Sequence, residues 1–207
     1  MTETLAAVGI ATLEHLELTA LALVMAALIG VPLGAYLTRF RELSGPVLGL
    51  VGVFQTIPSL ALLGLLIPVL GIGAKPALVA LYLYALLPIV RNTFAGLDSI
   101  DPAVLDAARG MGMRERQILV RISLPLALPV VMGGIRTSTV MCVGLATLAA
   151  LIGAGGLGRF IFRGISMVDS EQIMMGAVPA ALLALLLDGL LGLLERRLLP
   201  RGVRRGS

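Results

Sequence analysis

The chain has 207 residues, of which 58% are hydrophobic and 14% are charged, and its formal net charge is +4. Such a balance is rare in a soluble domain of this length, so the composition excludes an ordinary water-soluble enzyme and indicates an all-α integral membrane protein. The arginines flank apolar runs and are not interleaved with aromatic residues, which favours membrane lipid and argues against nucleic acid as a partner.

Five apolar segments are each long enough to cross about 30 Å of hydrocarbon. They cover residues 18–37, 46–70, 76–94, 125–152 and 172–194. Because Pro58 and Pro68 fall inside the second segment, we expect that span to be kinked or broken near its middle. No linker or internal repeat divides the chain, so residues 1–207 are treated as a single transmembrane domain.

Basic residues are distributed unevenly between the two sides of the membrane that five spans define. With the C-terminus inside, the outer side holds only Lys75, Arg159 and Arg163, and the inner side holds Arg39, Arg41, Arg91, Arg109, Arg114, Arg116, Arg121, Arg196, Arg197, Arg201, Arg204 and Arg205. Cytoplasmic loops carry the excess of basic residues, so the pattern predicts an outside N-terminus and a cytoplasmic C-terminus. The short basic tail is expected to contact anionic lipid.

The connection at residues 96–124 is the most highly charged part of an otherwise apolar chain. So many charges will not sit in hydrocarbon, and the arginine distribution places them in the cytoplasm. Asp101 can cap a first helix, and Gly112 permits a sharp turn after it. Residues 113–123 can form a second helix, which Pro125 is expected to end. The loop is therefore predicted to be a helix-turn-helix at the membrane surface.

Within this loop, a spaced motif resembles the EAA loop of the permeases of importer-type ABC transporters. The family pattern is Glu-Ala-Ala, three residues, Gly, nine residues, Ile, one residue and Leu-Pro, and it is matched here by Asp106, Ala107, Ala108, Gly112, Ile122, Leu124 and Pro125. Every spacing agrees, and Asp106 in place of Glu is the one departure. The resemblance implies a coupling helix that docks on a cytoplasmic ATPase, in the five-helix type I permease fold of methionine importers. Charge alone would favour a solvated hairpin without a partner, whereas the full spaced motif favours docking.

The same resemblance implies the partners. The chain has no P-loop around Lys75, its only lysine, so it is not expected to be an enzyme. ATP and magnesium are expected in two separate cytoplasmic ATPase subunits, with no cofactor in this chain. A second permease chain, identical or homologous, and an external solute-binding protein complete the expected assembly in a bacterial inner membrane. His15 and Cys142, each the only residue of its type, are too far apart to predict a metal site.

Further stretches resemble the permease subunits of osmoprotectant importers, which take up glycine betaine, carnitine or choline. They read QTIPSLA, LPIVRNT, GIRTST, ATLA and IGAGGLG, and begin at Gln55, Leu87, Gly134, Ala146 and Ile152. The resemblance implies alternating access with a compatible solute as cargo. The permease of a methionine-type amino-acid importer is an alternative within the same fold. A self-contained secondary transporter and a membrane assembly factor are competing classes, against which the spaced loop motif argues.

Polar side chains within the spans are the candidates for a solute path. They are Gln55, Thr56, Ser59, Tyr84, Arg136, Thr139 and Asp188. The first three surround Pro58, where a broken helix frees backbone carbonyls. Arg136 and Asp188 can instead pair with each other, and Tyr84 can pack in the core rather than offer a cation–π surface. A second long connection covers residues 153–171, and its glycine-rich start at residues 153–158 is interpreted as a flexible outer loop or gate.

Overall fold

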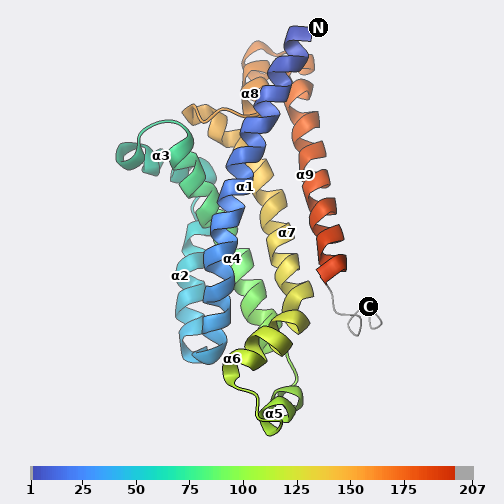
Figure 1. The fold of residues 1–207 in the computed structure, drawn as a ribbon. Helices are drawn as coiled ribbons and strands as arrows, with labels where there is room; N and C mark the ends of the chain where they lie inside the picture. The colour runs from blue at the N-terminus through green and yellow to red at the C-terminus, as the bar shows by residue number, and fades with distance from the viewer. Residues whose placement is uncertain (1, 199–207) are drawn as a thin grey trace.

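The structure is a computed structural model that describes residues 2–198, and within that range the chain consists of helices joined by short turns. The long helices are α1 (Thr2–Arg39), α4 (Ala74–Asp98), α7 (Leu124–Ala149) and α9 (Ser170–Leu198). The shorter ones are α2 (Ser44–Thr56), α3 (Ser59–Leu70), α5 (Pro102–Gly110), α6 (Glu115–Ile118) and α8 (Gly158–Met167), with helical turns at Arg41–Leu43, Leu119–Ser123 and Ala150–Ile152. Figure 1 shows the long helices side by side, with α5 and α6 at the end of the bundle opposite the N-terminus.

Four helical segments of the described range are long and apolar enough to cross a membrane, and α2 with α3 makes a fifth if that bent pair counts as one span. The predicted all-α membrane fold is therefore confirmed. The helix that contains the first predicted span begins earlier than that span, because α1 has 38 residues. Its length of about 57 Å is nearly twice the thickness of the hydrocarbon core. The N-terminal part of α1 therefore extends beyond the membrane.

The second predicted span is broken, as its prolines suggested. α2 and α3 meet at 95°. Ile57 and Pro58 lie between them in an extended conformation, with ψ angles of 127° and 134°. A residue that precedes proline is disfavoured in the helical region, so Pro58 sets the corner. Pro68 lies inside α3 and does not interrupt it.

α4 and α7 pack closely because α7 presents small residues at intervals of four. A Cβ on Gly134 would lie 2.7 Å from the carbonyl oxygen of Pro88. One turn further, the buried Ser138 hydroxyl donates to the carbonyl of Ala85 at 2.8 Å. The buried Cys142 thiol lies 3.6 Å from another α4 carbonyl oxygen. Small residues of this kind let two backbones approach each other within a membrane.

The connection predicted at residues 153–171 contains a helix that was not predicted, α8, whereas its glycine-rich start at residues 153–157 is not helical. A Cβ on Gly158 would lie 1.9 Å from the carbonyl oxygen of Thr147 in α7. A Cβ on Gly164 would lie 2.6 Å from the backbone nitrogen of Ile173 in α9. These two glycines therefore allow α8 to pack closely against α7 and α9.

Polar contacts fasten the same end of the bundle to α1. The Oε2 atom of Glu14 accepts hydrogen bonds from the Gly156 backbone N–H and from Arg159, each at 2.8 Å. The neighbouring His15 is fully buried, and its Nε2 lies 2.9 Å from the carbonyl oxygen of Val143 in α7. The predicted gate is therefore held to α1, which is itself in contact with α7 through His15.

Candidate functional site

α5 is a short helix with well-defined ends. Asp101 caps it as predicted, since its Oδ1 accepts a hydrogen bond from the Ala103 N–H at 2.8 Å. At the other end, the Met111 N–H donates to the carbonyl of Ala107 at 3.0 Å, and Gly112 follows with a φ angle of +81°. A left-handed residue just after a helix is usually glycine, so the turn itself explains the glycine of the motif.

Arg109 fixes the shape of the loop by linking α5 to α6. Its Nη1 lies 2.8 Å from Oδ1 of Asp106, and its Nε lies 2.9 Å from Oε1 of Glu115. These hydrogen bonds, to Glu115 first and then to Asp106, raise the pKa of Arg109. The three side chains are largely exposed to solvent, so the pairs define a geometry and contribute little stability.

The outer side of the α5 loop is open to a partner. Asp106, Ala107 and Gly112 are exposed, whereas Ala108 is buried against the rest of the loop. Met111 adds an apolar side chain that is 74% exposed. α5 projects from the end of the bundle (Figure 1). A projecting helix with both apolar and charged side chains can insert into a groove on another protein.

Pro125 does not end the second loop helix, which corrects the prediction. α6 continues through a π-helical turn at Leu119–Ser123 into α7. The Leu124 N–H donates to the carbonyl five residues back, and this widening accommodates the missing N–H of the proline that follows. Ile122 and Leu124 are half-buried at the base of the loop. The motif is therefore split, with its first four residues in the α5 turn and its last three in a helix that enters the membrane.

Among the solute-path candidates, Gln55 and Tyr84 join the broken span to α4. Pro88 has no N–H to donate to the carbonyl of Tyr84, one turn earlier in α4. The Gln55 side chain donates to that carbonyl instead, from Nε2 at 2.9 Å. The Tyr84 hydroxyl in turn donates to the carbonyl of Ile57, at the corner between α2 and α3. The tyrosine is 7% exposed, so its ring is packed in the core and offers no open cation–π surface in the single chain.

Thr56 and Ser59 flank the same corner without forming a solute pocket in the single chain. The Thr56 hydroxyl donates within its own helix to the carbonyl of Val53 at 2.7 Å. Ser59 lines a cavity of about 10 Å³ beside Tyr84. A space of that size holds about one water molecule at most.

Arg136 lies in an ionic cluster between α7 and α9. Its Nε and Nη2 donate to the two carboxylate oxygens of Asp188 at 2.8 and 2.9 Å, and its Nη1 lies 3.3 Å from Glu195. The pairing alternative is therefore confirmed. A Cβ on Gly192 would lie 3.5 Å from the guanidinium carbon, so the guanidinium rests over a glycine. Sequence analysis missed Glu195, although it lies two turns after Asp188 on the same helix. Thr139 is 1% exposed and donates within α7 at 2.8 Å.

The candidates thus fall into two groups. Figure 1 shows α2 and α9 on opposite sides of the bundle, with α1, α4 and α7 between them. Gln55 and Tyr84 belong to the first side, and Arg136 and Asp188 to the second. One chain alone does not bring the seven candidates into a single site.

The long apolar helices, the broken span and the projecting helical loop with its spaced motif define a permease of the type that ABC importers use. The chain belongs to the family described as binding-protein-dependent transport system inner membrane component, whose profile matches residues 19–200. It is therefore a multi-pass inner-membrane transport subunit, and the predicted family resemblance is confirmed.

Similar curated proteins are transport permeases. The osmoprotectant import permease protein OsmW of Salmonella typhimurium is 49% identical over 93% of this chain and 92% of its own length. The choline transport system permease protein OpuBB of Bacillus subtilis is 45% identical over 94% of this chain and 89% of its own length. The glycine betaine/carnitine/choline transport system permease protein OpuCB of the same organism is 44% identical, over 92% and 88%.

Solved structures of similar fold come from the MetNI methionine ABC transporter in inward-facing conformations. One crystal form matches with a TM-score of 0.86 and 25% identity, over 97% of this chain and all of that one. Another matches with a TM-score of 0.81 and 26% identity, over 90% and 94%. The predicted likeness to the methionine-importer permease fold is confirmed.

Proposed function

We propose that this chain is the membrane-spanning permease subunit of an ATP-driven importer of compatible solutes, with glycine betaine, choline and carnitine as the solute class. The exposed α5 turn with its spaced motif carries the proposal. The solute class is supported by relatives 42–49% identical whose names include osmoprotectants. Methionine appears in the names of structures only 25–26% identical, so an amino-acid importer is the weaker candidate.

In the proposed mechanism, two cytoplasmic ATPase subunits bind ATP and magnesium, and this chain needs no cofactor. α5 docks on one ATPase subunit as the coupling helix. Arg109 ties α5 to α6, and α6 runs without a break into α7. A displacement of α5 is therefore transmitted as rigid-body motion into a membrane helix, as alternating access requires.

In the proposed orientation, the N-terminus is outside and the C-terminus is cytoplasmic. The basic residues support this orientation, because the inner side would hold most of them. Arg201, Arg204 and Arg205 of the tail lie outside the described residues. An external solute-binding protein delivers the solute on the side of α8.

The path itself is proposed to form between this chain and a second permease chain, identical or homologous. Gln55, Thr56, Ser59 and Tyr84 remain candidates because they surround the broken span, where carbonyls are available. We assign Arg136 and Asp188, with Thr139 beside them, a mainly structural role. Their hydrogen bonds are already made within the chain.

Co-purification in detergent with the candidate ATPase tests the coupling role. Wild type is expected to hold the ATPase and the Gly112→Asp variant to release it, with membrane insertion unchanged. Gly110→Asp is the matched control, since a Cβ at either glycine meets nothing within 4 Å and only Gly112 has a positive φ. Gly112→Asn separates geometry from contact, because asparagine tolerates the left-handed conformation. Retention of the ATPase by Gly112→Asp would contradict docking through this turn.

Uptake into proteoliposomes tests the solute class. With the binding protein outside and ATP inside, radiolabelled glycine betaine is expected to accumulate, and excess choline or carnitine to compete with it. Methionine at the same concentration is the matched competitor and should have no effect. Uptake that needs an ion gradient and no ATP would instead support a secondary transporter.

A further inference from the structure

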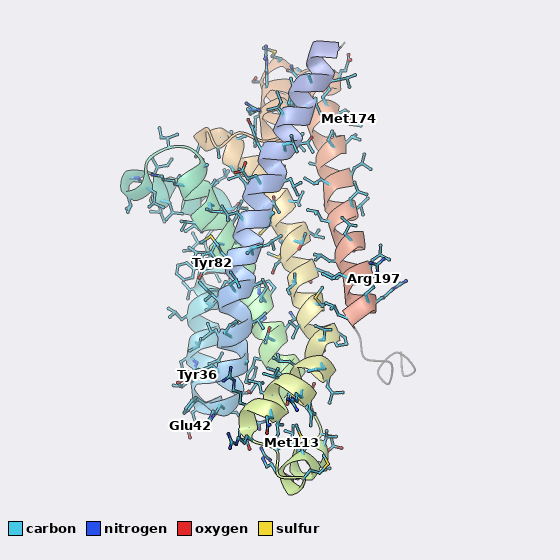
Figure 2. The ribbon with its side chains drawn as sticks, in the orientation of Figure 1. Tyr36, Glu42, Tyr82, Met113, Met174 and Arg197 are labelled. Carbon is cyan, nitrogen blue, oxygen red and sulfur yellow. The ribbon has the colours of Figure 1, made fainter. Side chains whose placement is uncertain are left out.

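A cavity of about 1050 Å³ lies at the end of the bundle that carries α5 and α6. Its walls come from the C-terminal part of α1, the corner between α4 and α5, and the continuous segment of α6 and early α7. Figure 2 shows Tyr36, one of the lining residues, at this end of the bundle, where Met113 marks the loop. None of the seven solute-path candidates lines it.

One part of the wall is apolar. Val31 and Ala35 from α1, Leu97 from α4, and Leu119 and Leu124 from the loop segment all line the cavity. They also belong to one packed cluster, in which Leu97 is buried. A large apolar surface of this kind favours a ligand with hydrocarbon chains and gives a small hydrophilic ion nothing to contact.

The remaining wall carries four arginines against three acids, a net charge of +1. These residues are Arg39, Arg41, Arg109, Arg116, Asp98, Asp101 and Glu115.

Two of the four arginines are already engaged within the chain, and two are not. Arg41 pairs with Asp98, and Arg109 pairs with Glu115 at 2.9 Å. Within residues 2–198, neither Arg39 nor Arg116 forms a direct ion pair or a side-chain hydrogen bond, although Arg39 is close enough to Glu115 to attract its charge. Both are exposed, so two guanidinium groups remain available to a ligand.

We propose that this cavity binds one anionic phospholipid from the inner leaflet. Its phosphate lies between Arg39 and Arg116, and its acyl chains lie against Val31, Ala35 and Leu97. The planar guanidinium matches a phosphate with paired hydrogen bonds. The inference rests on the proposed orientation, which places these arginines at the cytoplasmic surface, where anionic lipids attract basic residues.

The bound lipid would join the end of α1 to the α5 loop. The apolar part of the wall already packs α1, α4 and early α7 together, and at the polar rim the pair between Arg41 and Asp98 joins the turn after α1 to the end of α4. A lipid in this place would fix the angle at which α5 projects toward the ATPase. Anionic lipid would therefore increase ATP-driven transport as well as bind.

The test uses the complete importer, purified from lipid nanodiscs of phosphatidylcholine with increasing phosphatidylglycerol. Native mass spectrometry counts the phosphatidylglycerol retained by each permease chain. Wild type is expected to retain about one molecule, and Arg39→Gln with Arg116→Gln to weaken retention by about tenfold or more. The matched control is Arg91→Gln with Arg121→Gln, which removes the same charge at exposed positions outside the cavity. Ala35→Phe fills the apolar part without changing charge and should also reduce retention.

Three outcomes would overturn the proposal. Equal loss in the control pair would show general surface attraction, and equal retention of phosphatidylcholine would show that charge plays no part. Displacement of the lipid by millimolar inorganic phosphate at constant ionic strength would show a free-anion site instead. Retention can also be measured on the permease without ATPase, so failure of the lipid site is distinguishable from failure of the docking turn.

Discussion

Replacing Asp188 by asparagine tests how α9 is held against α7. In the wild type, both oxygens of Asp188 accept hydrogen bonds from Arg136, at 2.8 and 2.9 Å. An asparagine removes the negative charge and offers one acceptor oxygen in place of two. The guanidinium then keeps at most one neutral hydrogen bond at position 188, and its remaining ion pair is the longer contact to Glu195, at 3.3 Å.

The magnitude follows from the burial of the pair and from the partner that remains. The side chains of Arg136 and Asp188 are 36% and 34% exposed in the single chain, and this exposed part lies within predicted spans, where the surroundings are lipid or protein. Removing one partner of a buried ion pair costs about 3–5 kcal/mol. Because Glu195 still compensates part of the arginine charge, we expect Asp188→Asn to lower the free energy of unfolding by about 2–3 kcal/mol.

A variant that lacks all three charged side chains of the cluster tests the same clamp in a second way. With Arg136→Leu, Asp188→Leu and Glu195→Gln together, no charge of the cluster remains, and apolar replacement of a buried pair is often close to neutral. We therefore expect this triple variant to lie within about 1.5 kcal/mol of wild type, although it has lost every hydrogen bond of the cluster.

Unfolding by sodium dodecyl sulfate in mixed micelles, followed by circular dichroism, measures these differences. Arg163→Gln is the control, since this exposed arginine of α8 should change stability by less than about 0.5 kcal/mol. Asp188→Asn as stable as this control would refute the assignment of the pair as a helix clamp. The assignment would also be refuted if the triple variant had a free energy of unfolding as low as that of Asp188→Asn.

Much of this fold could be predicted from hydropathy and proline alone. Four of the five predicted spans lie inside single helices, because about 20 apolar residues admit few other structures in a membrane. Pro58 marked the broken span for a local reason, the restriction on the residue before it. The cap at Asp101 and the turn at Gly112 are local too, and both were predicted.

What sequence analysis missed depends on contacts between distant segments. The segment of α8 was predicted only as part of a connection, because the role of its glycines depends on their packing against α7 and α9. Pro88 in α4 indicates that the carbonyl of Tyr84 lacks its helical donor, but the sequence alone does not predict that Gln55 supplies a donor. The contact between Glu195 and Arg136 depends on the rotation of α9 about its axis, which the sequence does not specify.

Two further predictions concern these packed contacts. Gly134→Ala places a Cβ 2.7 Å from a backbone carbonyl oxygen of α4, so it should destabilise the chain by about 1–3 kcal/mol in the same micelle titration. Gly133→Ala is the control, because its Cβ would meet nothing within 4 Å, and it should change stability by less than about 0.5 kcal/mol. Equal effects at both glycines would show that α4 and α7 are not in close contact. Gln55→Leu keeps the size of the side chain and removes the donor to Tyr84, so the carbonyl is left without a partner at a cost of about 1–3 kcal/mol. Because Pro88 is unchanged in these variants, the carbonyl of Tyr84 still needs a donor from outside α4. The side chain of Gln55→Asn keeps the amide but is one methylene shorter, so the free energy of unfolding of this variant should lie between those of Gln55→Leu and wild type. Gln55→Leu as stable as wild type, with cysteine labelling at the α2–α3 corner unchanged, would show that the broken span is held by Pro58 alone.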